Sequence, residues 1–189
     1  MIYIIRHKIV HKITFLSMAL CIIGFSFNSA VYAQPYGKGT YGANVPYGSQ
    51  TSLSIATGAD VSIQITPDDN GVIGTGNNIV TVTSTDVVGY TLYIRSLTSS
   101  DMTNGPAVLP ASANITSLPL AVNTWGYNTS GSGTNFIGMT ASNVLVKSAS
   151  GPFSSGDPTT FTYGVKLDNQ KPAGNYVTSV VYTAAPQTD

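Results

Sequence analysis

Hydrophobic and polar residues alternate along most of the chain after Thr51. Val61, Ile63 and Ile65 are separated by polar residues, and this run ends at the turn-forming sequence TPDDNG. An alternation with period two predicts a half-buried strand, because successive side chains of a strand point to opposite faces. Residues 78–86 and 89–97 repeat the pattern with two valines between them. They are predicted to form the next pair of strands, with Tyr90, Leu92 and Ile94 on one face.

The last third of the chain carries the strongest alternation. Phe161, Tyr163, Val165 and Leu167 are predicted to face inward, and the residues between them outward. Residues 175–183 follow the turn sequence NQKPAG and are predicted to return as the second strand of a hairpin.

The middle of the chain is less regular. Residues 98–119 are rich in Ser, Thr, Asn, Pro and Gly and are predicted to be a long surface connection. Trp125 and Tyr127 are predicted to share one side of a short strand, and residues 143–148 supply another strand.

These elements predict an all-β fold. After the N-terminal apolar run, no window of eleven residues has a helical stripe, and the strong helix former Glu is absent from the sequence. About eight short strands joined by Gly, Pro and Asn turns predict an antiparallel β-sandwich over residues 51–189. A closed barrel has the same pattern and remains an alternative.

The N-terminus has the three parts of a secretory signal peptide. Basic residues at positions 6, 8 and 12 precede an apolar run from Ile13 to Phe27, and small residues lead up to Ala33. This order predicts export, with residues 1–33 removed by cleavage. An uncleaved membrane anchor and a lipoprotein signal are the alternatives; Cys21 follows the bulky Leu20, where a lipoprotein site needs a small residue. Membrane contact is therefore expected only through an uncleaved leader.

Residues 34–50 contain three Tyr-Gly pairs, at Tyr36, Tyr41 and Tyr47. Their glycines raise the entropic cost of ordering, so the segment is predicted to be a flexible spacer before the folded domain. The alternative is that these tyrosines stack on sugars or lie along the sheet edge of a neighbouring subunit.

The composition after the leader restricts the chemistry. Residues 34–189 contain no His, Cys or Glu, eight Asp, and five scattered Lys or Arg. Disulfides, triads based on histidine or cysteine, and histidine metal sites are thereby excluded, and no cofactor is predicted. Nucleic acid is not an expected partner, since phosphate binding needs clustered basic residues. The Asp residues of DDNG and LDNQ are predicted to form turns; a catalytic acid pair or a calcium loop is the weaker interpretation.

Three stretches carry a resemblance to a known group: VTVTSTDVVGYTLYI, NTWGYNTS and YGVKLDNQKPAGNYVTSVVYTAAP. Together they resemble secreted surface proteins of candidate-phylum bacteria and are similar to the WxL domain of Gram-positive cell-surface proteins. Tyr90 and Tyr182 stand where that family has its two signature Trp residues; Leu92 is retained, and Ala184 replaces the second Leu. Further matches are Ala173, Gly174, Tyr176 and Pro186. The resemblance implies export, surface display and a sandwich fold. In that family, non-covalent attachment to peptidoglycan is associated with the two signature Trp residues, and this chain has Tyr at both positions.

The leading hypothesis is a non-enzymatic protein of the bacterial cell surface with a structural or adhesive role. Its expected partners are cell-envelope polymers, other surface proteins or copies of itself, because its strands present mainly uncharged Ser and Thr. One alternative is a module that binds carbohydrate or peptidoglycan. Another is a fibre subunit joined through residues 34–50. Four aromatic residues are candidate ligand contacts, and for Trp125 a position in the core is the competing interpretation: Tyr90, Trp125, Tyr176 and Tyr182.

Overall fold

The computed structural model describes residues 51–187, which form strands and no helix. No helix in this part of the chain has the length and hydrophobicity needed to cross a membrane. The predicted leader (1–33) and the Tyr-Gly segment (34–50) lie outside the described residues. The strands are β1 (Ser52–Thr57), β2 (Val72–Thr85), β3 (Gly89–Ser96), β4 (Met102–Asn104), β5 (Ala107–Leu109), β6 (Leu118–Pro119), β7 (Thr124–Asn128), β8 (Asn135–Phe136), β9 (Val144–Ser150), β10 (Phe153–Leu167) and β11 (Val180–Gln187).

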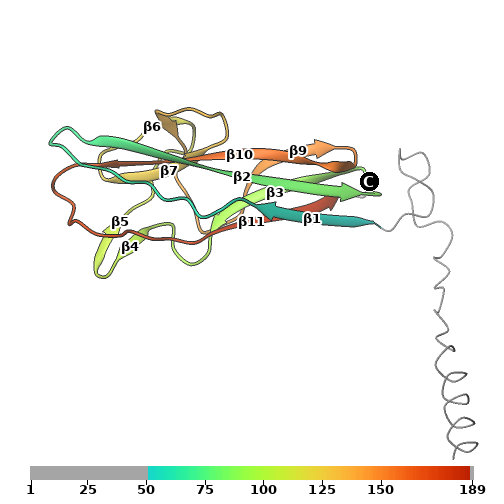
Figure 1. The fold of residues 1–189 in the computed structure, drawn as a ribbon, viewed down its shortest axis with the longest axis horizontal. Helices are drawn as coiled ribbons and strands as arrows, with labels where there is room; N and C mark the ends of the chain where they lie inside the picture. The colour runs from blue at the N-terminus through green and yellow to red at the C-terminus, as the bar shows by residue number, and fades with distance from the viewer. Residues whose placement is uncertain (1–50, 188–189) are drawn as a thin grey trace, which may run out of the picture. The chain divides into compact units, whose positions relative to one another are not determined.

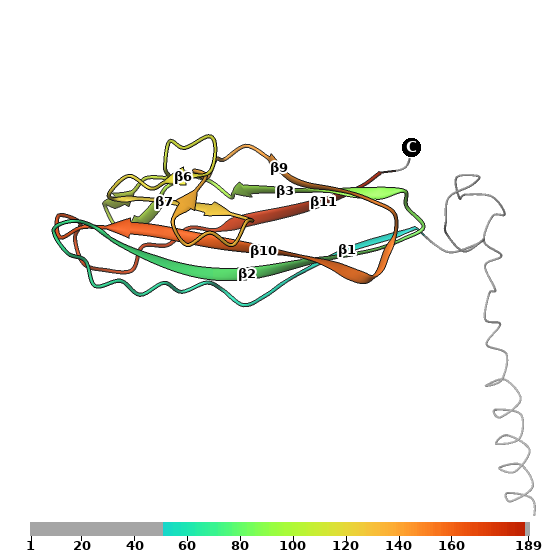
Figure 2. The same ribbon diagram turned by 90° about the horizontal axis from the view of Figure 1, so that it is seen from above.

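Two antiparallel sheets pack against each other, so the predicted β-sandwich is confirmed (Figures 1 and 2). One sheet has the strand order β1-β2-β10-β7, and the other has the order β11-β3-β9. The pairs β4-β5 and β6-β8 are separate two-stranded ribbons. At one end of the sandwich β1 and β11, the edge strands of the two sheets, contact each other.

The core lies between the two sheets and is built from the predicted inward faces. Tyr90, Leu92 and Ile94 of β3 are fully buried, as are Val80 and Val82 of β2. Apolar burial of this kind is the main stabilising contribution available to a domain without disulfides. The period-two pattern therefore predicted correctly that Tyr90, Leu92 and Ile94 share one face.

The two predicted strand pairs do not form, because each connection crosses between the sheets. β2 pairs with β1 and β10, whereas β3 pairs with β11 and β9. Asp86 adopts a positive φ of 57°, and the buried Val87 follows it into the second sheet. In the same way, residues 168–179 carry the chain from β10 to β11. Side-chain alternation reports the face of a strand and does not report its partner.

β10 also differs from its prediction, because both of its faces are covered. Thr162 and Gly164, expected to face outward, are buried. A Cβ on Gly164 would collide with the ring of Phe136, which the β6-β8 ribbon holds against this face. The glycine thus permits a close approach that any side chain would block. Residues 98–119, predicted as a surface connection, contribute the β4-β5 hairpin and the buried Leu109 to the core.

The predicted strand at Val61–Ile65 alternates as expected but joins no sheet. Its three apolar residues are half-buried and the polar residues between them are exposed. Within the described part of the chain, residues 59–66 form no backbone hydrogen bond. The segment lies against β2 at Gly74 and Gly76, where an added Cβ would collide with Val61, Ile63 or Ile65. Val61–Ile65 therefore has the side-chain alternation of a strand but no backbone hydrogen bonds to a neighbouring strand.

Candidate functional site

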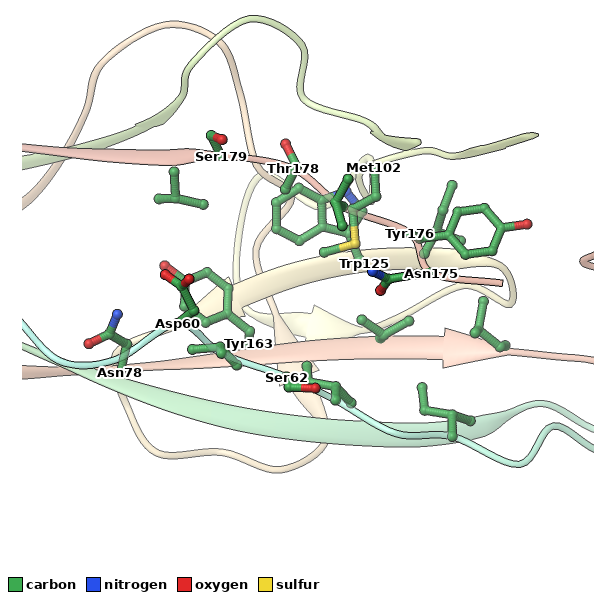
Figure 3. A pocket seen from close by; sticks show the side chains of 18 of the residues that line it. Asp60, Ser62, Asn78, Met102, Trp125, Tyr163, Asn175, Tyr176, Thr178 and Ser179 are labelled. Carbon is green, nitrogen blue, oxygen red and sulfur yellow. The ribbon is translucent and has the colours of Figure 1, made fainter. Parts of the chain in front are cut away.

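A groove of about 660 Å³ runs between two extended segments at the open edge of the sandwich (Figure 3). Thr57–Ile65 forms one wall, and Gly174–Tyr182, which leads into β11, forms the other. The two segments lead away from the end of the sandwich where β1 and β11 touch (Figure 1). A groove of this volume is in the range that proteins use to bind ligands.

The floor of the groove is mainly apolar. Trp125 of β7 and Tyr163 and Val165 of β10 contribute from the four-stranded sheet, and Met102 and Leu109 come from the β4-β5 hairpin. Trp125 is fully buried, and its indole N–H donates to the carbonyl of Ser100 at 3.0 Å. The indole is therefore already satisfied by the protein. An occupant of the groove would meet both apolar and polar groups along its lining.

Both walls present backbone groups that lack partners within the described residues. On one wall, residues 59–66 form no backbone hydrogen bond. On the other, the N–H and C=O of Val177 pair with Thr103 at 3.0 Å each. Since backbone groups alternate sides along a strand, those of Tyr176 and Thr178 face the opposite way. The groove is therefore bordered by two open strand edges.

Two tyrosine hydroxyls meet at one end of the groove. Tyr163 and Tyr182 hydrogen-bond to each other across the two sheets, and the rings of Phe161 and Tyr182 lie 4.9 Å apart. Burial, followed by the neighbouring Tyr182, raises the pKa of Tyr163. Burial also raises the pKa of Tyr182, against a smaller opposing effect of its hydrogen bond with Tyr163. Both phenols are consequently neutral at physiological pH.

Few of the described residues that line the groove have an ionisable side chain. Among the described residues that line it, Asp60 is the only carboxylate, and the other ionisable groups are tyrosines. General acid-base catalysis needs a group that changes protonation near the working pH.

Three of the four predicted aromatic candidates lie at this groove, and Tyr90 does not. Tyr176 and Tyr182 line its wall and are half-buried. Trp125 lies at the bottom, fully buried, so its ring face is not presented to solvent and it occupies the core position that was the competing interpretation. Tyr90 is also fully buried, between the sheets. Neither buried ring is available to stack on a sugar in this conformation.

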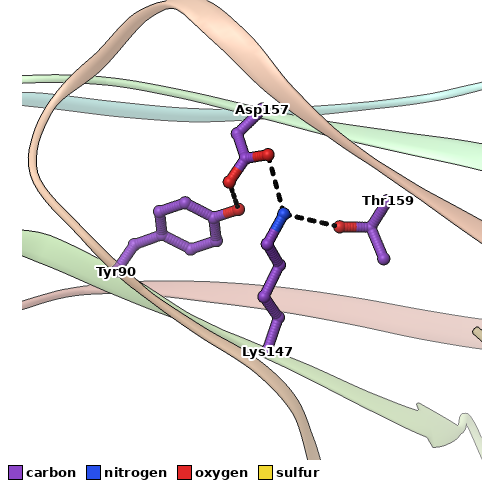
Figure 4. A network of polar contacts seen from close by, with 4 residues as sticks. All are labelled: Tyr90, Lys147, Asp157 and Thr159. Carbon is purple, nitrogen blue, oxygen red and sulfur yellow. Dashed lines mark hydrogen bonds and ion pairs between the residues drawn. The ribbon is translucent and has the colours of Figure 1, made fainter.

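Tyr90 belongs to a separate polar cluster that links the sheets (Figure 4). Its hydroxyl donates to Asp157 Oδ2 at 2.7 Å, and Lys147 Nζ contacts Asp157 Oδ1 at 2.7 Å. Lys147 also approaches Thr159 at 3.4 Å. Desolvation alone would raise the pKa of Asp157, but the hydrogen bonds from Lys147 and Tyr90 outweigh it and lower the pKa. Burial, reinforced by Asp157, raises the pKa of Tyr90. The cluster joins β3 and β9 to β10.

The Asp-rich loops form turns, as predicted. Asp68 Oδ1 accepts a hydrogen bond from the backbone N–H of Asn70, and Asp168 Oδ1 accepts one from that of Gln170, both at 2.9 Å. Asp69 accepts from the side chain of Asn169 at 2.8 Å. In residues 51–187, no group of three or more His, Cys, Asp or Glu residues is placed to hold a metal ion.

The residues at the groove that the sequence reasoning missed are Met102, Leu109 and the open backbone edges. Val61, Ile63 and Ile65 were recognised as a strand, but their pattern carries no information about hydrogen-bond partners. Met102 and Leu109 lie in a stretch without periodicity, so no local signal marked them. They reach the groove only because the β4-β5 hairpin folds over the end of the core.

The fold and the groove define an all-β sandwich with an open groove at one edge. No protein-family model, curated protein or solved structure matches the chain. The resemblance to the WxL domain therefore stays a hypothesis from the sequence, and function has to be inferred from the groove.

Proposed function

We propose that this chain is a non-enzymatic, exported protein of the bacterial cell surface whose β-sandwich holds an extended polypeptide segment in its groove. The observation that carries the proposal is the pair of backbone edges without partners among the described residues, along residues 59–66 on one wall and at Tyr176 and Thr178 on the other. An added strand would satisfy backbone groups on both walls through main-chain hydrogen bonds, and its alternate side chains would enter the floor. Such binding serves a structural or adhesive role in the envelope.

A carbohydrate ligand suits the groove less well. Sugar binding relies on exposed ring faces with polar side chains around them. Here Trp125 is buried and the floor is completed by Met102, Leu109 and Val165. The half-buried Tyr176 and Tyr182 are the only two of the four predicted aromatic contacts that an occupant can reach.

The test measures what the groove binds. The full chain is expressed with its own leader and purified in the form that the cells produce. It is then screened against displayed random peptides and, separately, against purified peptidoglycan. We expect enriched peptides to carry apolar residues at alternate positions, and their binding to be lost in Ile63→Asp. Thr75→Asp, which puts the same charge on an exposed position of β2, is the control.

Two results would overturn the proposal. One is the absence of enriched peptides. The other is retention on peptidoglycan that Ile63→Asp leaves unchanged, which would favour the carbohydrate-binding alternative. Export is checked on the same material by N-terminal sequencing, where Gln34 is the expected first residue.

A further inference from the structure

We infer that the occupant of the groove is the stretch Tyr41–Tyr47 of a second copy of this chain, so that copies join head to tail. The inference rests on the proposed function, and it names the segment that the groove takes. It depends on three observations, namely the open edges of the groove, the side-chain pattern of Tyr41–Tyr47, and the length of chain between that stretch and β1.

The stretch has the pattern that the groove requires. Tyr41, Ala43, Val45 and Tyr47 are apolar or aromatic and occupy alternate positions, with Gly, Asn and Pro between them. In an extended chain these four side chains point to one face, toward half-buried apolar lining residues such as Ile63 and Met102. The intervening residues point outward, where small and polar side chains suit contact with water. Pro46 gives up one ladder hydrogen bond, since it has no N–H.

The length of the stretch also matches. Seven residues in a strand span about 20 Å at roughly 3.3 Å per residue. The wall from Thr57 to Ile65 bends at Ala59, and its alternating part, Val61–Ile65, is long enough to border most of the stretch. The edge groups of Tyr176 and Thr178 on the other wall then receive strand-like partners.

The chain's own segment cannot fill the groove in this way. Thr51 precedes β1, and the groove begins at Thr57, which is about 20 Å further along at roughly 3.3 Å per residue. Tyr47 lies only four residues before Thr51, so it reaches at most about 14 Å from it. Within one chain, four residues are too few to carry Tyr47 from Thr51 as far as Thr57. Only a second copy brings all four side chains to the floor.

Charge does not oppose the contact between copies. Asp60 is the only charged side chain among the described residues that line the groove, and the stretch Tyr41–Tyr47 has no charged residue. A neutral strand on a nearly neutral surface has no charge repulsion to overcome. Assembly of this kind satisfies the open edges that would otherwise be exposed to any other strand.

The experiment follows the size of the full chain, expressed with its own leader, by gel filtration with light scattering over a wide concentration range. A donor variant carries Tyr41→Ser and Val45→Ser, with Tyr36→Ser, outside the alternating stretch, as its control. An acceptor variant carries Ile63→Asp, with Thr75→Asp as its control. Thr178→Pro is a second acceptor variant, because it removes a backbone N–H of the open edge and leaves the Val177–Thr103 pair in place. Thermal unfolding verifies that each variant is folded.

We expect the unaltered chain and both controls to form species that grow with concentration. Loss of two buried side chains should weaken assembly by more than about a hundredfold in the donor variant. The donor and acceptor variants should each be monomeric. Mixed in equal amounts they should form a one-to-one dimer and nothing larger, because the mixture contains one intact segment and one intact groove per pair.

The results separate failure of this inference from failure of the proposed function. A chain that stays monomeric but still binds displayed peptides through its groove overturns the inference and leaves the proposed function in place. A monomer that is destabilised by Tyr41→Ser and Val45→Ser shows that the segment binds within its own chain, which also overturns it. Assembly that persists in both variants excludes this groove as the joint. A groove that binds no peptide and forms no assembly removes both proposals.

Discussion

The hydroxyls of Tyr163 and Tyr182 hydrogen-bond to each other across the sandwich. Tyr163 belongs to β10 of the four-stranded sheet, and Tyr182 to β11 of the three-stranded sheet. Their contact therefore ties the two sheets together at the end of the groove, beside the ring of Phe161. The wall Gly174–Tyr182 is thus fixed to the core at its last residue, Tyr182.

Replacing Tyr182 by Phe should destabilise the domain. The change leaves the buried hydroxyl of Tyr163 without its partner, and an unsatisfied buried polar group costs about 1–3 kcal/mol. The double variant Tyr163→Phe with Tyr182→Phe should lose less than the sum of the single changes, since it leaves no orphaned hydroxyl. Urea unfolding measures each free energy. Tyr176→Phe, whose hydroxyl bonds the carbonyl of Pro172 at an exposed site, is the control; strictly additive losses would contradict the coupling.

Alkaline pH should destabilise the fold through its buried tyrosines. Burial raises the pKa of Tyr127, Tyr163 and Tyr182, and burial together with Asp157 raises that of Tyr90. Above the ordinary value of 10.0, the unfolded chain releases these protons and the folded chain keeps them. Stability is therefore complete below about pH 10 and falls as the pH rises toward the folded pKa values. Tyrosinate absorbance, followed together with urea unfolding, should show these four groups ionising only as the protein unfolds.

Asp157→Asn should lower stability near neutral pH by about 1–3 kcal/mol, because Tyr90 and Lys147 lose their charged acceptor. The pKa of Asp157 is lowered in the folded state. Its contribution is thus present above the unfolded value of 3.8 and is lost as the pH falls through the folded pKa. The difference between the variant and the parent should shrink on acidification.

The control for this pH dependence is Asp60→Asn, which alters an exposed carboxylate with no hydrogen bond to the rest of residues 51–187. It should give a much smaller difference at neutral pH. A difference for Asp157→Asn that stays constant from neutral to strongly acidic pH would show that the Asp157 charge does not contribute.

Gly164→Ala should destabilise the sandwich by about 1–3 kcal/mol, the usual cost of overpacking. The added Cβ would collide with the ring of Phe136, which cannot retreat because it is fully buried. Gly133→Ala is the matched change, since nothing lies within 4 Å of its added Cβ. It should be neutral or stabilising by about 0.4–1 kcal/mol. Equal thermal unfolding midpoints for the two variants would show that the face of β10 is not tightly covered.

The sequence predicted an all-β fold and the residues of β3 and β7 that share a face, because these depend on local alternation. Tyr90, Leu92 and Ile94 form one buried face, and Trp125 and Tyr127 share one side of β7, as expected. The turn role of Asp68 and Asp168 was equally local, since each side chain bonds a backbone N–H two residues on.

Strand pairing and the groove were decided by the tertiary structure. Alternation looks the same in a strand with two partners, such as β10, as in Val61–Ile65, which joins no ladder. Which edges stay open depends on how chain segments distant in sequence meet, and no residue pattern records that. The sequence by itself determined an all-β chain with no histidine, cysteine or glutamate after residue 33. Only the packing of the two sheets decided that two of its extended segments border a groove with unpaired backbone edges.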